Sequence, residues 1–429
     1  MALFAGAARE IITPKVGTLL RGYNDHNKST SVNDDLTVTA LALKSGDVTA
    51  LLISATVSLI HGRLADEIRQ KAGEIAAVSP DNVILAATHT HSGPFTTGYG
   101  KDNVKMDVEY CKNVFVPKCL EAAKSAFAAL APAKAGVGIT ESKVGINRRQ
   151  LLRDGTVILG QNPWDSYDST MTVISFRGTD GKPIANVVHV GAHPTAAGIC
   201  PEISRDWPGV LVDRLDEESN AITLFVNGTL GDVAPRMANG GSTGDMKHVM
   251  EVGGLAAIDA VRAYKSIKSF HDEPLEVVSG VLSLPYKEPF PEAEIPGLME
   301  GLDERWSGAQ SKLVSLEWLA EMYKTGDMGP SEWKYRQSII RLGPVVFVPF
   351  PFETVTEIGL RLRAYSPFEH SLLLSCTNGS NLYLVAESQL CRGGYEVECF
   401  LWGRPRQLPD DSDRRLVDQN LALIEKLNT

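Results

Sequence analysis

The chain has 429 residues, of which 43% are hydrophobic and 22% are charged, as is usual for a globular protein with a large core. Its formal net charge of −10 argues against a general nucleic-acid surface, although a local pocket can still attract an anionic substrate. The length suits two or three average domains or one elaborate α/β enzyme. The sequence has no run of about 18 apolar residues, so we expect no membrane-spanning helix.

The N-terminus and the cysteines indicate a reducing compartment. Residues 1–14 lack the basic start, apolar centre and small-residue cleavage site of a secretion signal. None of the six cysteines belongs to a Cys-x-x-Cys pair. We therefore expect a cytoplasmic protein with reduced thiols and without stable membrane anchoring.

The first third of the chain predicts strands joined by a helix. Residues 3–12 are expected to form an edge strand, and residues 36–43 and 48–60 form two strands joined by a Ser-Gly-Asp hairpin turn. Residues 62–76 have helical spacing and lead into another strand. A helix between strands predicts a βαβ unit and hence an α/β fold.

A polar loop at residues 21–26 contains Gly22 and Tyr23. Glycine lets the backbone approach a ligand closely. A plain surface turn explains this loop equally well.

Residues 83–94 end a buried apolar strand with Thr-His-Thr-His-Ser-Gly-Pro. Because residues i and i+2 of an extended segment point to one side, His89 and His91 are expected to face one pocket at the strand end. One imidazole can hold a metal while the other handles protons or orients the substrate. Two satisfied loop histidines are the alternative.

The middle of the chain adds candidates that follow strands. Arg148 is either a surface charge or a clamp for a carboxylate or carbonyl. His193 again follows an apolar strand. Asp232 lies in a Gly-rich turn, residues 227–235, whose backbone N–H groups can face an oxyanion. The predicted elements are helices at 106–129, 208–219 and 245–265 and strands at 134–141, 170–176, 184–190 and 222–226.

The last third predicts strands at 337–342, 344–350 and 372–375 and helices at 309–324, 355–365 and 413–427. Glu353 follows a buried apolar segment and precedes a helix, so it is either a first-turn glutamate or a metal ligand. We expect one catalytic domain over residues 1–429, in which residues 266–330 form an insertion or a substrate-covering segment.

Two histidines and a carboxylate are a common ligand set of catalytic zinc. His89, His193 and Glu353 each leave an apolar strand and enter a loop, so they are candidates for this set. Such a zinc ion lowers the pKa of its bound water to about 7 and polarises a carbonyl.

The stretches THTHSGP, AHPT, GDVAP, PFE and YLVAESQLCRGGYE, in this order, resemble the neutral/alkaline non-lysosomal ceramidase family over about residues 3–400. The resemblance implies that family's catalytic domain, an α/β fold with a mixed β-sheet core and flanking helices. It also implies an amide-cleaving zinc centre held by His89, His193, Glu353 and Tyr383. His91, Arg148 and Tyr395 match positions that contact the substrate or the developing oxyanion, and Gly22 and Tyr23 match a loop near that site. We place Asp232 with Gly22 and Tyr23 among the substrate-binding candidates.

Two departures from the family shape the expected function. Ala234 stands where family members carry a serine that is proposed to take part in the chemistry. We also expect no C-terminal immunoglobulin-like domain of the kind that family members carry. We therefore expect a Zn²⁺-dependent hydrolase that cleaves an amide of a small or polar N-acyl substrate with metal-activated water. A zinc esterase or lactonase and a non-catalytic metal-binding homologue are the alternatives. The expected partner is a small-molecule substrate and not a nucleic acid, and a homo-oligomer is compatible with the sequence.

Overall fold

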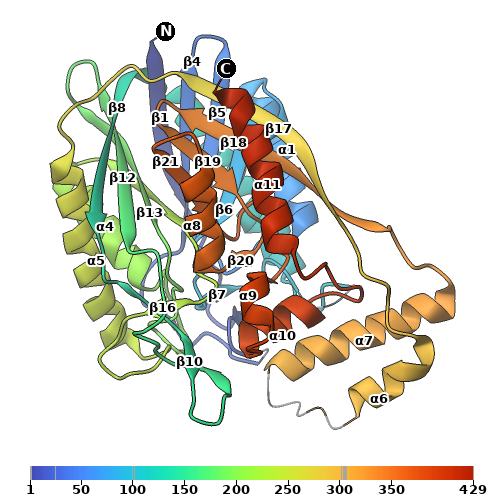
Figure 1. Cartoon of the computed structure of the whole chain (residues 1–429). Helices are drawn as coiled ribbons and strands as arrows, with labels where there is room; N and C mark the ends of the chain where they lie inside the picture. The colour runs from blue at the N-terminus through green and yellow to red at the C-terminus, as the bar shows by residue number, and fades with distance from the viewer. Residues whose placement is uncertain are drawn as a thin grey trace.

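The computed structural model describes residues 2–24, 26–98, 100, 102–300, 302 and 307–428. It is a mixed α/β fold with two β-sheets, as the sequence predicts (Figure 1). In spatial order, the first sheet contains β15 (Ile222–Asn227), β13 (Pro183–Val190), β12 (Thr170–Gly178), β8 (Ala131–Glu141), β1 (Leu3–Ile11), β4 (Thr37–Ser45), β5 (Val48–Ala55) and β6 (Val83–Ala87). The second sheet contains β17 (Leu275–Pro285), β18 (Glu332–Leu342), β19 (Val345–Pro349) and β21 (His370–Leu374).

Short strand pairs and helices complete the described fold. The pairs are β2 (Leu20–Arg21) with β7 (Gly93–Pro94), β3 (Ser31–Val32) with β14 (Glu202–Ile203), β9 (Gly145–Asn147) with β16 (Val233–Pro235), β10 (Arg149–Leu151) with β11 (Val157–Leu159), and β20 (Glu353–Thr354) with β22 (Tyr383–Leu384). The helices are α1 (Gly62–Ala76), α2 (Val108–Tyr110), α3 (Val116–Ala128), α4 (Trp207–Ser219), α5 (Met246–Ser266), α6 (Ile295–Met299), α7 (Ser307–Thr325), α8 (Thr356–Tyr365), α9 (Glu387–Leu390), α10 (Tyr395–Trp402) and α11 (Ser412–Ile424). No helix among the described residues is both long enough and apolar enough to cross a bilayer.

Alternating side chains let each sheet bury both faces. In β4, Val38, Ala40 and Ala42 pack in the core under α1 and α3, whereas Leu41 and Leu43 point to the opposite side. That opposite side is a central core shared with the second sheet, which contributes residues such as Phe347. Helices α4 and α5 cover the outer face of β12, β13 and β15, and α8 and α11 cover the second sheet (Figure 1).

The first sheet folds over, so that strands far apart in its order approach one another. Among the described strands, the backbone pairing of Leu3–Ala5 with Ala131–Ala133 joins its two halves. The Ser54 hydroxyl of β5 donates a 2.5 Å hydrogen bond to the carbonyl of Phe225 in β15. The strand ends that carry the histidines are thereby brought near each other.

The structure confirms the βαβ unit, because β5 and β6 are parallel with α1 between them. Hairpins are confirmed at Gly46 and at Gly181, whose φ is +83°. The prediction of residues 3–12 as an edge strand is wrong, because β1 lies between β8 and β4. The half of β1 that contains Arg9 and Glu10 pairs only with β4.

Two other elements are shorter or less regular than predicted. The strand predicted over 48–60 ends at Ala55. The helix predicted over 106–129 contains a π-helical turn at Cys111–Phe115, and α3 then begins with Pro117 in its first turn. Proline has no N–H for the usual bond to the carbonyl of residue i−4, and it lies where the π-helical turn meets α3.

Gly138 of β8 tests the packing of α5 against the first sheet. A Cβ at this position would overlap the Ala263 carbonyl of α5, so we expect Gly138→Ala to lower the free energy of unfolding by about 1–3 kcal/mol. Gly254→Ala on α5 is the control, because a Cβ there meets no atom within 4 Å and should stabilise the helix by about 0.5–1 kcal/mol. Urea unfolding of the two variants measures both changes. The same change in the free energy of unfolding in both variants would contradict the close packing of α5 against β8 at Gly138.

Candidate metal centre

The predicted site residues come together at strand ends and in the loops that follow them. His89 and His91 follow β6, His193 follows β13, and Glu353 begins β20. Tyr383 lies opposite Glu353 in the parallel pair of β22 with β20. The side chains of His89, His193, Glu353 and Tyr383 are buried. Four distant segments of the sequence therefore supply one polar cluster in an otherwise apolar interior.

The polar atoms of this cluster lie at a nearly constant spacing. The Glu353 Oε2 atom lies 3.3 Å from His89 Nε2 and 3.2 Å from His193 Nε2. The Tyr383 hydroxyl oxygen is 3.3 Å from His193 Nε2. His91 Nε2 is 3.3 Å from His89 Nε2. Ligand atoms around a tetrahedral zinc ion with bonds of about 2.0–2.1 Å lie about 3.3 Å apart, so the spacing fits that ion.

Backbone carbonyls fix which nitrogen of each histidine carries the proton. His89 Nδ1 is 2.7 Å from the Ser58 carbonyl, and His193 Nδ1 is 2.6 Å from the Leu230 carbonyl. A carbonyl only accepts, so each Nδ1 must be the donor and each neutral ring keeps its lone pair on Nε2. Both lone pairs therefore point at the carboxylate of Glu353, an arrangement that a bound cation satisfies.

Electrostatics keep the cluster in the protonation state that a metal requires. Burial, reinforced by the charge of Arg148, lowers the pKa of His193 to about 3, so this imidazole is neutral. Burial alone would raise the pKa of the Glu353 carboxyl, but this pKa lies well below its usual range, because His89 and His193 favour the carboxylate whenever either ring carries a second proton on Nε2. Metal ligation needs neutral histidine and ionised carboxylate.

The histidines approach each other by a different route from the one the sequence suggests. His89 has a left-handed backbone with φ of +76°, so residues 89–91 are not an extended segment. The expectation that both imidazoles face one pocket is met, but the reason given for it is wrong. A non-glycine residue in this conformation is strained and is retained where its surroundings enforce it.

Gly22 allows His91 to occupy its place. A Cβ at Gly22 would lie 2.5 Å from the His91 Cβ. The Tyr23 ring packs edge-on against the imidazole, with ring centroids 5.0 Å apart, and its hydroxyl donates a 3.4 Å hydrogen bond to the Thr195 carbonyl. Burial, together with the neighbouring His89 and His193, lowers the pKa of His91 well below its usual value.

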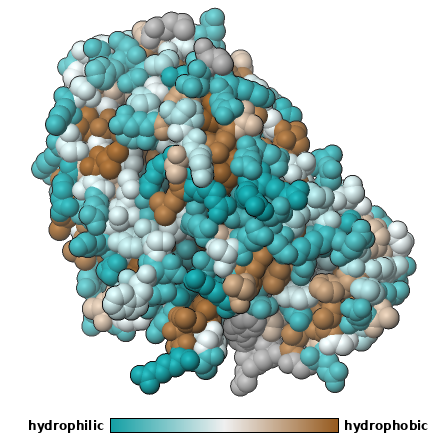
Figure 2. Space-filling view, viewed as in Figure 1, coloured by the Kyte–Doolittle hydropathy of each residue, from teal (hydrophilic) through white to brown (hydrophobic). Residues whose placement is uncertain are grey.

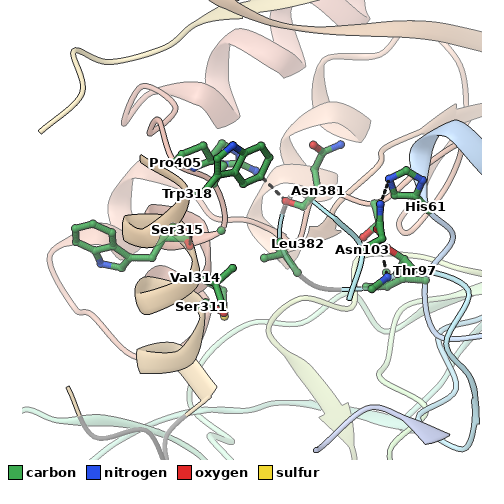
Figure 3. A pocket seen from close by; sticks show the side chains of 18 of the residues that line it. His61, Thr97, Asn103, Ser311, Val314, Ser315, Trp318, Asn381, Leu382 and Pro405 are labelled. Carbon is green, nitrogen blue, oxygen red and sulfur yellow. Dashed lines mark hydrogen bonds between the residues drawn. The ribbon is translucent and has the colours of Figure 1, made fainter. Parts of the chain in front are cut away.

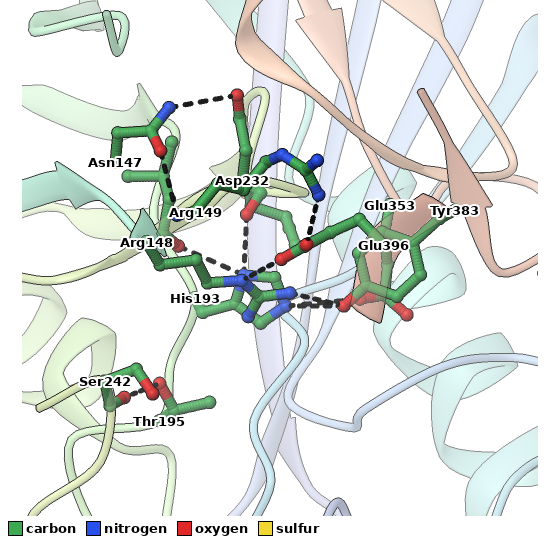
Figure 4. A network of polar contacts seen from close by, with 12 residues as sticks. Asn147, Arg148, Arg149, His193, Thr195, Asp232, Ser242, Glu353, Tyr383 and Glu396 are labelled. Carbon is green, nitrogen blue, oxygen red and sulfur yellow. Dashed lines mark hydrogen bonds and ion pairs between the residues drawn. The ribbon is translucent and has the colours of Figure 1, made fainter. Parts of the chain in front are cut away.

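Arg148 supports the cluster from behind Tyr383. Its guanidinium donates a 2.8 Å hydrogen bond to the Tyr383 hydroxyl and another of 2.8 Å to Glu396 (Figure 4). The opposite oxygen of Glu396 accepts a 2.7 Å hydrogen bond from Arg149. Tyr395 packs against Tyr383 with ring centroids 5.5 Å apart. Arg148 thus orients Tyr383.

Asp232 is bound to the framework on both of its carboxylate oxygens. One oxygen accepts 2.8 Å hydrogen bonds from the backbone N–H and the hydroxyl of Thr356, and the other accepts a 3.3 Å bond from Asn147 (Figure 4). Gly231, which precedes it, lets the Glu353 carbonyl approach, since a Cβ there would lie 2.7 Å from that oxygen. Asp232 therefore anchors the loop and the start of α8.

A cavity of about 830 Å³ opens above the cluster. His89, His91, Glu353, Tyr383 and Tyr395 line one part of it. Gly22 and Tyr23 of the predicted loop line it too, and Val314 and Trp318 of α7 contribute an apolar wall (Figure 3). Within the segment predicted as an insertion or cover, β17 belongs to the second sheet, whereas α7 lines this cavity. Substrate covering by this segment stays a prediction.

Sequence reasoning missed Asn227, the last residue of β15. Its buried side-chain amide donates a 3.0 Å hydrogen bond to the Thr88 carbonyl and a 3.1 Å bond to the Ala192 carbonyl. These are the residues immediately before His89 and His193. Only its position at a strand end, before the Gly-rich turn, could have drawn attention to it. Trp207 was also missed, and its indole N–H donates 2.9 Å to the His193 carbonyl.

No protein-family model matches the sequence, and no curated protein matches it. Solved structures match at high similarity of fold. The neutral ceramidase from Pseudomonas aeruginosa is 18% identical, with a TM-score of 0.77, over 99% of this chain and 75% of that chain. A ceramidase complexed with C2 is 16% identical, with a TM-score of 0.77, over 100% of this chain and 75% of that chain. The chain therefore has a neutral-ceramidase-like fold, which confirms the predicted resemblance and fold class.

The described residues contain one group of at least three histidine, cysteine or acidic side chains that could hold a metal, namely His89, His91 and His193, with ligand atoms within 4.8 Å of one another. Two of its members, His89 and His193, are ligands that the sequence predicts. The third, His91, is the residue that the sequence assigns to proton handling. The group supports a metal at the predicted place.

Asn227 gives a test of how the two histidine segments are held. Asn227→Asp keeps the shape but replaces both N–H donors with acceptors, so two buried carbonyls lose their partners. We expect the free energy of unfolding, measured in urea, to fall by about 2–6 kcal/mol, at roughly 1–3 kcal/mol for each unsatisfied group. Asn239→Asp is the control, because this exposed side chain makes one comparable 2.9 Å bond to the Thr243 carbonyl. Similar losses in both variants would show that Asn227 is not a tie between the two segments.

Proposed function

We propose that the protein is a zinc-dependent hydrolase that cleaves the amide bond of a small or polar N-acyl substrate. One observation is its main support: the Nε2 lone pairs of His89 and His193 both point at the buried carboxylate of Glu353 at the floor of a cavity. His89, His193 and Glu353 would hold the ion, with Tyr383 as a fourth ligand. A zinc ion bound there activates a water molecule and polarises the scissile carbonyl.

Other residues of the chain would transfer protons, stabilise the oxyanion and orient Tyr383. His91, a neutral imidazole at the cavity surface, can accept a proton from the attacking water and return one to the leaving amine. Tyr395 also lines the cavity, and its hydroxyl can donate a hydrogen bond to the oxyanion that develops on the substrate. Arg148 keeps Tyr383 in place through their 2.8 Å hydrogen bond.

The surroundings of Ala234 support water as the nucleophile. Ala234 is fully buried in β16, opposite Ile146 of β9, and is not among the residues that line the cavity. Ser92 and Thr229, the nearest hydroxyls by motif, are buried and do not line it either. A covalent route through any of these three positions would need a side chain that the cavity does not reach.

A cytoplasmic location is part of the proposal. All six cysteines have free thiols, and several of them are buried. Free thiols are the usual state of cysteine in a reducing compartment.

The metal assignment is tested by the zinc content of purified variants. We expect about one zinc ion per chain in the unmodified protein and strongly reduced zinc in His193→Ala, because that change removes a ligand and its lone pair. His271→Ala is the control, since His271 is an exposed histidine that contacts Ser269. Zinc is measured by atomic emission on protein whose folding is checked by circular dichroism. Full zinc in folded His193→Ala would disprove the assignment.

The division of roles is tested with a panel of N-acyl amides and matched esters. Tyr395→Phe should keep its zinc and lower kcat about 10²–10³-fold, because it loses one oxyanion donor. Tyr383→Phe should instead weaken zinc binding, as measured by competition with a chelator. Hydrolysis of esters alone would favour an esterase or lactonase. Folded, zinc-loaded protein that turns over neither class would leave a non-catalytic metal-binding protein.

A further inference from the structure

Four arginines, Arg21, Arg63, Arg404 and Arg406, line the cavity, and the proposed chemistry uses none of them. Arg404 and Arg406 follow α10, and Pro405 between them also lines the cavity (Figure 3). We call Arg404 and Arg406 the arginine pair. Arg404 is 8% exposed, so its charge is largely withdrawn from water. A buried charge is costly unless it is paired.

Neither guanidinium forms an ion pair with a carboxylate in the part of the chain that the structure describes. Arg404 donates to two carbonyls, a 2.9 Å bond to Asn381 and a 3.4 Å bond to Phe400, although a guanidinium has five N–H donors. Burial lowers the pKa of Arg404 to about 10, with no carboxylate to oppose it. The arginine pair therefore has N–H donors without a hydrogen-bond acceptor and positive charge without a carboxylate partner.

Arg406 repeats this pattern beside Arg404. Its Nη1 donates a 3.0 Å hydrogen bond to the Pro330 carbonyl, and its guanidinium lies 5.2 Å from the ring centroid of Tyr286, which also lines the cavity. Its Nε is buried and has no hydrogen-bond partner. Buried N–H groups without a partner are uncommon and call for an explanation.

The acidic residues of the cavity are engaged elsewhere. Glu353 belongs to the metal cluster. Glu321 lies 3.6 Å from the Lys324 ammonium, and the carboxylate of Asp327 accepts a 2.9 Å hydrogen bond from the Gly329 backbone. Both side chains are at exposed positions on the rim. The lining therefore contains four arginines against three carboxylates, none of which forms an ion pair with Arg404 or Arg406 among the described residues, although the formal net charge of the protein is −10.

The arginine pair is connected to the metal cluster through the backbone. Arg404 binds the Asn381 carbonyl, and the carbonyl of the next residue, Leu382, accepts a 2.7 Å hydrogen bond from the Glu353 N–H. Tyr383 follows directly. Because the metal cluster and the arginine pair also line the same cavity, one molecule bound there can contact both.

We infer that Arg404 and Arg406 bind a carboxylate carried by the substrate, so that the preferred substrates are acidic N-acyl amides. Arginine suits this role because its planar fork of donors matches a carboxylate in two parallel hydrogen bonds. The apolar wall of Val314, Trp318 and Met322 would contact the hydrocarbon part of the same molecule. This inference rests on the proposed amide hydrolysis and narrows its substrate class.

Two substrate series test the inference without assuming the distance between amide and carboxylate. One series is N-octanoyl glycine, 4-aminobutyrate and 6-aminohexanoate; the other is the mono-octylamides of succinic, glutaric and adipic acid. Each acid is compared with its own carboxamide, which has the same shape and no charge. For at least one spacing, we expect kcat/KM to be about 10- to 100-fold higher for the acid, as for hydrogen bonds to a charged group.

Substitutions of Arg404 and Arg406 test whether the arginine pair causes the preference for the acid over its carboxamide. Arg404→Met and Arg406→Met keep an unbranched side chain without the charge, and each should reduce the acid-to-carboxamide ratio about 10-fold or more. Arg404→Lys should keep part of it. Arg153→Met, an exposed arginine on the β10–β11 hairpin, removes the same charge from the chain and should leave the ratio unchanged. The carboxamide rate in each variant reports folding, and Arg406→Met decides the matter if Arg404→Met does not fold.

Binding measurements separate this inference from the proposed function. Calorimetric titration of the chelator-treated, metal-free protein should show tighter binding of the best acid than of its carboxamide, and Arg406→Met should remove the difference. That result without any hydrolysis would keep the anion site and reject the amidohydrolase. Hydrolysis with an acid-to-carboxamide ratio within about 3-fold of one, unchanged in both methionine variants, would overturn the anion site and keep the hydrolase.

Discussion

The site depends on two backbone carbonyls, those of Ser58 and Leu230, which accept hydrogen bonds from the Nδ1 atoms of His89 and His193. Each carbonyl fixes the tautomer of one ring, so that both Nε2 lone pairs meet at Glu353. Without a cation this arrangement places acceptors against acceptors, which a buried site tolerates poorly. The ring tautomer is therefore a consequence of the fold, and the affinity for a metal follows from the tautomer.

The fold provides this convergence by bending its first sheet. His89 and His193 follow strands that are far apart in the sheet order, yet one amide, that of Asn227, bonds the residue before each of them. Left-handed residues concentrate around the same place: His89, Cys376 and Leu382 have φ values of +76°, +53° and +56°. Such conformations cost of order 1–3 kcal/mol each and persist where surrounding contacts enforce them. Rigid strand ends and strained loops together fix the ligands.

Local patterns in the sequence predict much of this, and long-range contacts explain the rest. Apolar runs locate β6, β13 and β19, and the polar residues after them identify His89, His193 and Glu353. The sequence does not predict the left-handed conformation of His89, because histidine has no strong preference for it. The same residues are equally typical of an extended segment. Asn227 and the place of β1 inside the sheet depend on partners more than 100 residues away, so no local signal marks them. The role of Asp232 as an anchor depends likewise on Thr356.

The candidate metal ligands and the rest of the cavity wall lie on different kinds of structure in this protein. The ligand candidates stand at strand ends that are tied by backbone hydrogen bonds, whereas α7 and residues 403–406, outside the two sheets, provide much of the remaining cavity wall. Residues of that wall can change without disturbing the tautomers of His89 and His193, since among the described residues no hydrogen bond, ion pair or ring contact joins Arg404 or Trp318 to either imidazole. A shared fold at 18% identity is therefore compatible with a different substrate. The two unpaired arginines are the strongest physical sign, on this wall, of what that substrate must carry.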